Sequence, residues 1–195
     1  MNVPSAARWT AALIARNKLI SGSVAVFAVA AIVVSLLTSS AKALPPAPAA
    51  AGFSMTALGE SGQHVSLSQY QGKPVIVNFW AAWCTDCQTE TPLLASWYKQ
   101  QHGHVALVGL DENDSTAKAL TFAHAKGITY PLGFDPLTSA ASAYGVIALP
   151  QTFFLNAKHR IVQRVFGAVT KAELAQGMSL MNAPGTPGEK VISPS

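Results

Sequence analysis

Charge is scarce in this 195-residue chain and unevenly placed. Charged residues make up 11% of the sequence and hydrophobic residues 50%, a balance that excludes disorder for most of the length. The net charge of +4 comes mainly from Arg8, Arg16 and Lys18, which precede the first acidic residue, Glu60. The sequence has no cluster of Lys and Arg that could follow a phosphate backbone, so we expect no nucleic-acid partner.

Cysteine is also scarce, since the chain contains only Cys84 and Cys87. A disulfide between residues so close in sequence closes a very short loop and adds little stability. A zinc site would need a second pair of ligands, but there is no third cysteine, and His102 and His104 lack the spacing of a zinc-binding pair. We therefore expect a chemical role for the two cysteines, with no metal and no other cofactor.

A long uncharged stretch dominates the start of the chain. No charge occurs between Lys18 and Lys42, and residues 19–37 are predominantly apolar. As a helix, this run rises ~28 Å at ~1.5 Å per residue, close to the thickness of the hydrocarbon core of a membrane. Because positive charges precede the run, we predict a cytoplasmic leader over residues 1–18 and a transmembrane anchor over residues 19–38.

The alternative is a signal peptide cleaved after Ala43, because residues 41–43 read Ala-Lys-Ala. Both alternatives export the rest of the chain. The first gives a single-pass protein of the bacterial inner membrane whose domain faces the periplasm or exterior, and the second gives a periplasmic protein. Residues 39–52, rich in Ala and Pro, are expected to form a linker.

Beyond this linker the pattern predicts one α/β domain, residues 53–182, and a disordered tail, residues 183–195, rich in Pro and Gly. Residues 75–80 form a nearly continuous apolar run, which is typical of a central strand buried on both faces. Strand–helix–strand units followed by a hairpin and a helix indicate a central mixed sheet flanked by helices. The other expected strands are 53–58, 64–67, 105–110, 130–134, 152–155 and 161–166, and the expected helices are 85–101 (kinked at Pro92), 114–126, 137–144 and 170–181.

The two cysteines follow the predicted central strand and open the predicted helix 85–101. The unpaired N–H groups and the dipole of a helix N-terminus favour an anion, here the Cys84 thiolate. The thiolate is the reactive form of cysteine. We expect Cys84 to be exposed and to attack the disulfide of a partner, and Cys87, one turn inward, to be shielded and to resolve the mixed disulfide.

Two separated motifs resemble a known family. Residues 75–87 read VIVNFWAAWCTDC, and residues 148–154 read ALPQTFF. Both are similar, in the same order, to motifs of the membrane-tethered TlpA/ResA/DsbE-like relatives of thioredoxin, which are thiol:disulfide interchange proteins with redoxin or AhpC-TSA-like domains. The resemblance spans about residues 53–181 and implies a thioredoxin-like fold and thiol–disulfide exchange.

The resemblance also implies how a client is held. Pro150 matches the cis-proline of the family, which lies against the redox pair and leaves backbone groups free to pair with an incoming peptide. Trp83, Leu149 and Pro150 are therefore the expected substrate-binding residues. Trp80 is either part of this site or plain core.

A third catalytic residue is expected at Glu90, which matches an acidic position that tunes the cysteine pKa values in ResA-like members. A solvated surface glutamate is the alternative. Asn78 stands where cytoplasmic thioredoxin has a buried aspartate, and an amide cannot accept a proton from Cys87, so a base role would move to Glu90, Asp86 or water.

The leading functional hypothesis is a protein-disulfide reductase. It would receive electrons from a membrane thiol transporter and reduce an exported client, such as an apocytochrome c or a copper-site assembly protein. An oxidase or isomerase uses the same chemistry in another direction. A peroxidase would carry Pro-x-x-x-Thr-x-x-Cys, a pattern absent before Cys84. The non-enzymatic alternative is a copper metallochaperone, with His104, His124 or His159 completing a thiolate site.

Overall fold

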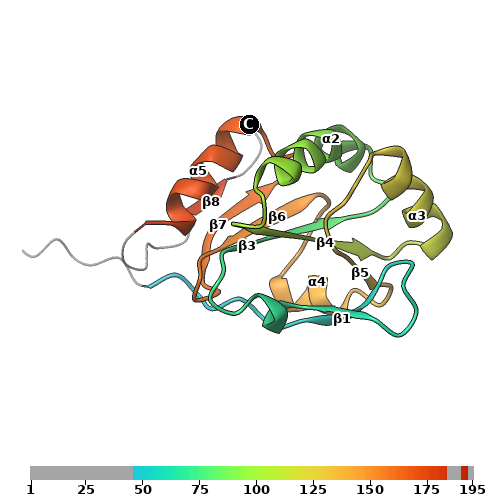
Figure 1. The fold of residues 1–195 in the computed structure, drawn as a ribbon, viewed down its shortest axis with the longest axis horizontal. Coiled ribbons are helices and arrows are strands. Elements are labelled where there is room, and N and C mark those ends of the chain that lie inside the picture. The colour runs from blue at the N-terminus through green and yellow to red at the C-terminus, as the bar shows by residue number, and fades with distance from the viewer. Residues whose placement is uncertain (1–45, 184–189, 193–195) are drawn as a thin grey trace, which may run out of the picture. The chain divides into compact units, whose positions relative to one another are not determined.

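The computed structural model describes residues 46–183 and 190–192, which form an eight-stranded mixed sheet with helices on both faces (Figure 1). The strand order is β2-β1-β5-β4-β3-β6-β7-β8. The predicted leader and transmembrane anchor, residues 1–38, lie outside the described residues. Within the described part, no helix is long and apolar enough to cross a membrane.

The elements follow the predicted order. The strands are β1 (Ser54–Ala57), β2 (His64–Ser66), β3 (Val75–Trp80), β4 (Ala106–Glu112), β5 (Leu132–Asp135), β6 (Gln151–Leu155), β7 (Ile161–Phe166) and β8 (Lys190–Ile192). The helices are the 3-10 turn η1 (Leu67–Tyr70), α2 (Thr85–Gln100), α3 (Thr116–Ala125), α4 (Ser139–Tyr144) and α5 (Lys171–Met181).

Strand β3 lies inside the sheet, as its apolar sequence predicts, and all of its residues are buried. It pairs parallel to β4, with Val75 opposite Ala106, and antiparallel to β6, with Val75 opposite Leu155. Strands β4 and β5 are also parallel, whereas β1 and β7 run antiparallel to their neighbours β5 and β6. The expected α/β architecture with a central mixed sheet is confirmed.

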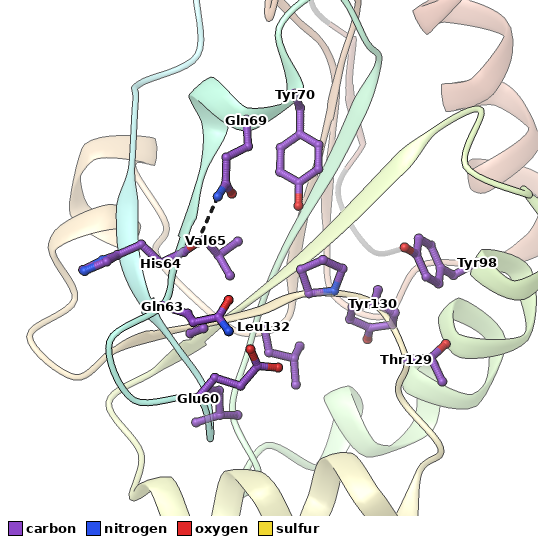
Figure 2. A pocket seen from close by; sticks show the side chains of 13 residues that line it. Glu60, Gln63, His64, Val65, Gln69, Tyr70, Tyr98, Thr129, Tyr130 and Leu132 are labelled. Atoms are coloured by element: carbon purple, nitrogen blue, oxygen red, sulfur yellow. Dashed lines mark hydrogen bonds between the residues drawn. The ribbon is translucent and has the colours of Figure 1, made fainter.

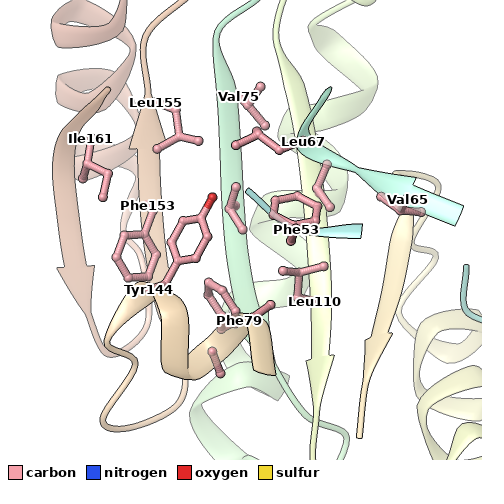
Figure 3. Close-up of a cluster of buried hydrophobic side chains, with 14 residues drawn as sticks. Phe53, Val65, Leu67, Val75, Phe79, Leu110, Tyr144, Phe153, Leu155 and Ile161 are labelled. Carbon is pink, nitrogen blue, oxygen red and sulfur yellow. The ribbon is translucent and has the colours of Figure 1, made fainter. Parts of the chain in front are cut away.

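Alternate residues of the sheet build a core on each face. On one face Tyr144 of α4 packs on Phe79 and Phe153, with ring centroids 5.3 and 5.0 Å away (Figure 3). On the opposite face the side chains meet α2 and α5. There Gly177 of α5 lies so close to Phe154 that an added Cβ would be 2.1 Å from the ring. Only glycine fits at this crossing of helix and sheet.

Helix α2 runs without interruption through Pro92. Proline has no N–H, so Pro92 cannot donate to the carbonyl of Gln88 one turn earlier. Lys126 supplies the missing donor, since its Nζ lies 3.1 Å from the Gln88 oxygen. The end of α3 is thereby joined to α2 at the carbonyl that the proline leaves without a helical partner.

The predicted linker, residues 39–52, differs from the structure over its described part. Ala47 is buried, the Ala50 N–H donates to the His159 carbonyl at 2.9 Å, and Ile161 N–H donates to the Pro48 carbonyl at 2.9 Å. Arg160 Nε also donates to the Ala47 carbonyl. This segment is bonded to the β6–β7 turn because that turn offers free backbone groups, so the packed domain begins before residue 53.

The predicted disordered tail, residues 183–195, is wrong for residues 190–192. These form β8, which pairs parallel to β7 with Lys190 opposite Gln163. Lys-Val-Ile is too short to predict a strand alone, but the open edge of β7 offers it a ladder of unpaired backbone groups.

Candidate active site

Cys84 and Cys87 form a disulfide just beyond β3, where α2 begins. The sulfurs are 2.12 Å apart. Cys84 is the N-cap of α2, and its Sγ accepts a hydrogen bond from the Cys87 N–H at 3.1 Å. The predicted position at a helix N-terminus is confirmed, and the donor that would stabilise a Cys84 thiolate is already directed at its sulfur.

The expected exposure of Cys84 needs correction. Cys84 is only 6% exposed and Cys87 is fully buried, so the order of accessibility is as predicted but the attacking sulfur is not freely open. Both cysteines belong to an apolar cluster with Trp80, Ala81 and Phe122.

The turn before the disulfide is held by the β4–α3 loop. The Ala82 N–H donates to Asp114 Oδ2 at 2.7 Å, and Trp83 Nε1 donates to the Asn113 carbonyl at 3.1 Å. Trp83 is nevertheless 57% exposed. Its indole is therefore fixed in orientation while its face remains open beside Cys84. Trp80, by contrast, is buried and stacks on Phe122 with centroids 5.0 Å apart, so it is core.

The loop before β6 reaches the same place. The Leu149–Pro150 peptide bond is cis, as the resemblance implied, and Leu149 packs against the apolar cluster that contains both cysteines. The Pro150 carbonyl accepts from the Gly167 N–H at 3.0 Å, and Gln151 Oε1 accepts from the Ile147 N–H at 3.3 Å. The structure thus brings the predicted residues Trp83, Leu149 and Pro150 to one end of the sheet with the disulfide.

Glu90 is buried beneath the site, so the alternative of a solvated surface glutamate is wrong. It is 2% exposed, and its two oxygens accept from Asn78 Nδ2 at 2.8 Å and from the Val169 N–H at 2.7 Å. Asn78 Nδ2 also lies 3.0 Å from Thr152 Oγ1. Desolvation by burial raises the pKa of Glu90 to about 7, although the two hydrogen bonds oppose this rise. A carboxyl of this kind can exchange a proton at neutral pH.

Comparisons with known proteins agree with this geometry. A model of the AhpC/TSA family matches residues 46–164, more than half of the chain. The chain belongs to the AhpC/TSA family.

Within this family the chain is similar to the thiol-disulfide oxidoreductase ResA of Bacillus subtilis, with 31% identity over 66% of this chain and 72% of that protein. Among solved structures it is similar to a DsbF homologue from Corynebacterium diphtheriae, with 29% identity, coverage of 72% and 88%, and a TM-score of 0.59. A secreted thiol-disulfide isomerase from Corynebacterium glutamicum matches with 26% identity, coverage of 65% and 81%, and a TM-score of 0.60.

These findings confirm the expected TlpA/ResA/DsbE-like group, the thioredoxin-like fold and the enzyme class. This AhpC/TSA member is a thiol-disulfide oxidoreductase with a Cys84–Cys87 disulfide.

Sequence reasoning missed the residues of this AhpC/TSA domain that hold the active-site turn. The sequence pattern predicts Asp114 only as the start of a helix and predicts no role for Asn113, although the Asp114 carboxylate holds Ala82 and the Asn113 carbonyl holds Trp83. Asn113 has a φ of 49°, a left-handed conformation that asparagine tolerates better than most residues. The Asn-Asp pair directly after a buried strand is the signal that could have predicted a loop of this kind.

The histidines considered for a copper site do not gather at the cysteines. His159 Nε2 lies 3.0 Å from the Tyr70 carbonyl, at the β6–β7 turn. Across residues 46–183 and 190–192, no group of three or more His, Cys, Asp or Glu side chains could hold a metal ion.

Two cavities differ in their relation to the disulfide. A polar cleft of about 450 Å³ lies between the β1–β2 turn and the start of β5, with Glu60, Tyr70 and Tyr98 on its walls (Figure 2). None of its lining residues belongs to the active-site turn. A more apolar groove of about 490 Å³ lies between Trp83 and α3, lined by Ala117, Thr121 and Phe122 among others. The apolar groove therefore adjoins the active site, whereas the polar cleft does not.

Proposed function

We propose that this protein reduces disulfides of exported client proteins, with Cys84 as the attacking sulfur and Cys87 as the resolving sulfur. The observation that carries this assignment is the N-cap position of Cys84, where the Cys87 N–H points at its sulfur and Cys87 itself is fully buried. Cys87 is completely enclosed, whereas Cys84 keeps a small exposed fraction of 6%, so Cys84 is the cysteine that a client reaches first.

The exchange proceeds in two steps. The Cys84 thiolate attacks one client sulfur, a mixed disulfide forms, and the other client sulfur leaves as a thiolate. Cys87 then loses its proton and attacks Cys84, which restores the Cys84–Cys87 disulfide and releases the second client thiolate. Two electrons pass to the client in total. Glu90, one helical turn from Cys87 and titrating near neutral pH, is the proposed acceptor of the Cys87 proton.

Client recognition is assigned to the surface around the disulfide. Trp83 and Ile147 are exposed by 57% and 81%, and they lie on the active-site turn and on the loop that leads to Pro150. The apolar groove beside Trp83 continues this surface along α3. We propose that the client backbone pairs with the loop at Leu149–Pro150 while an apolar side chain of the client rests against Trp83.

The direction of electron flow is proposed to be reducing. Asp86 is exposed in the first turn of α2, and Glu90 lies one turn beyond Cys87. Negative charge at either carboxylate disfavours the Cys84 thiolate, and a less stable reduced form makes the pair a stronger reductant.

The proposed setting is the exterior of the bacterial inner membrane, with residues 19–38 as a single-pass anchor, or the periplasm if the chain is cleaved after Ala43. The proposed electron donor is a membrane thiol transporter, and proposed clients are an apocytochrome c or a copper-site assembly protein.

Two cysteine variants of the full chain test the roles. Cys84→Ser should abolish reduction of a protein disulfide such as that of insulin, because no attacking sulfur remains. Cys87→Ser should accumulate a mixed disulfide with the client, detected as a dithiothreitol-sensitive adduct on a gel. Trapping by Cys84→Ser and not by Cys87→Ser would reverse the assignment.

The reduction potential of the pair tests the direction. A value near that of thioredoxin, ~−270 mV, supports a reductase, and a value near that of the oxidant DsbA, ~−120 mV, supports an oxidase.

A further inference from the structure

Two buried polar groups without partners among the described residues belong to neighbouring positions of β3 and β4. Asp111 is fully buried, and neither of its carboxyl oxygens has a hydrogen-bond partner among the described residues. Trp80 is in register with it on the neighbouring strand, and Trp80 Nε1 also lacks a partner. An unsatisfied buried group costs ~1–3 kcal/mol, so two at adjacent positions call for a functional explanation.

These groups lie at the redox end of the sheet. Trp80 belongs to the apolar cluster that contains Cys84 and Cys87. Asp114, whose negative charge acts on Asp111, holds the Ala82 N–H of the active-site turn. Asp111 therefore lies on the same side of the sheet as Trp80, at the end of β4 nearest the redox pair, and it is not placed in contact with a client.

The surroundings of Asp111 favour its neutral form. Burial raises its pKa to about 7, and the neighbouring charge of Asp114 adds to the rise. The residues in register with Asp111 on the two neighbouring strands are apolar, Trp80 on β3 and Phe134 on β5. The carboxylate of Asp135 on β5 is not directed at Asp111, because it accepts hydrogen bonds from the N–H groups of Ser139 and Ala140 at the start of α4. Its partner in register on β4 is Glu112.

Glu90 is held differently. Its carboxylate accepts two hydrogen bonds, from Asn78 and Val169, which favour the ionised form. Asp111 has no such donor. No donor among the described residues fixes Asp111 in its ionised form, so its protonation responds to nearby charges. The largest change of charge at this end of the sheet is the formation of the Cys84 thiolate.

We propose that Asp111 takes up a proton when the Cys84–Cys87 disulfide is reduced and releases it when the disulfide reforms. This inference rests on the proposed roles of the two cysteines. Reduction by a donor dithiol delivers two electrons and leaves a thiolate at Cys84 and a thiol at Cys87, while the donor becomes a disulfide. The new negative charge in a water-poor cluster strengthens proton binding at Asp111, so one proton enters from solvent. Reoxidation by a client disulfide removes the two electrons and returns that proton to solvent.

The first test counts protons. The reduction potential of the full-length chain is measured against dithiothreitol buffers between pH 6 and 8.5, and its slope against pH gives the protons bound per two electrons. We expect Asp111→Asn to show a shallower slope than wild type, by up to one proton per two electrons. Glu60→Gln, which removes an exposed carboxylate from the β1–β2 turn, should keep the wild-type slope. Equal slopes for wild type and Asp111→Asn overturn the proposal.

The deciding result of a second measurement comes from wild type alone, and two variants assign the band. The reduced-minus-oxidised infrared difference spectrum of wild type at pH 7 should contain a new carbonyl stretch of a protonated carboxyl. The band should persist in Glu90→Gln and be absent from Asp111→Asn, whereas its absence from wild type overturns the proposal. Failure of the proposed function gives a different result, because a wild-type pair that never equilibrates with dithiothreitol yields no potential at any pH.

Discussion

Glu90 supplies the most direct test of the buried site, through the pH dependence of folding. Its carboxyl is 2% exposed, and burial raises its pKa from 4.5 to about 7. Between pH 4.5 and pH 7, Glu90 is protonated in the folded chain and ionised in the unfolded chain. The stability that this proton contributes is fully present below pH 4.5 and is lost as the pH rises through 7.

The magnitude follows from the two pKa values. Because the pKa of Glu90 is raised from 4.5 to about 7, the free energy of unfolding falls by ~3 kcal/mol between these pH values, at ~1.4 kcal/mol for each pH unit. Glu90→Gln cannot ionise, so this loss disappears. The Gln amide has one oxygen where Glu90 has two, so either the Asn78 or the Val169 donor loses its acceptor. This loss costs ~1 kcal/mol at every pH.

The assay is urea unfolding of the oxidised full-length chain, followed by tryptophan fluorescence at pH 5 and pH 8. We expect wild type to lose ~2–3 kcal/mol more than Glu90→Gln between these two values. Glu60→Gln is the matched control, because Glu60 is exposed. If wild type and Glu90→Gln lose the same stability, the carboxyl is not held neutral by burial and the reasoning fails.

Three further predictions concern packing and client binding. Gly177→Ala should lower the urea midpoint by an amount equivalent to ~1–3 kcal/mol or more, because its Cβ would lie 2.1 Å from Phe154; an unchanged midpoint would mean that the helix can move away. Arg160→Ala should speed amide exchange at Ala50, measured by NMR, without changing disulfide reduction, because Arg160 fixes the segment through Ala47. Trp83→Ala should lower kcat/KM for a protein client far more than for a small disulfide, and equal losses would remove Trp83 from client recognition.

Much of the fold could be predicted because its signals are local. Residues 75–80 are apolar at every position but one, which is typical of a strand buried on both faces. The strands 152–155 and 161–166 are separated by a short polar turn, and β6 and β7 form the expected antiparallel hairpin. The cysteine pair could be placed at a helix N-terminus because a strand signal ends immediately before it.

The features that escaped prediction depend on partners distant in sequence. Glu90 is buried because Asn78 and Val169, 12 and 79 positions away, supply donors to its two oxygens. The helical pattern alone does not show which side of α2 faces the sheet at that position. Asp111 reads as an ordinary polar residue at a strand end, and its lack of a partner is visible only with β3 beside it.

The bonding of residues 47–50 to the β6–β7 turn fixes where any preceding polypeptide joins the domain. That turn lies at one end of β6 and Pro150 at the other, and five residues of strand separate these ends by roughly 16 Å. A tether, a fused protein or a solid support attached upstream of residue 46 would therefore be joined to the end of the sheet opposite the cysteines. Attachment at this junction leaves Trp83, Pro150 and the disulfide at the far end of β6 from the point where residue 46 enters the domain.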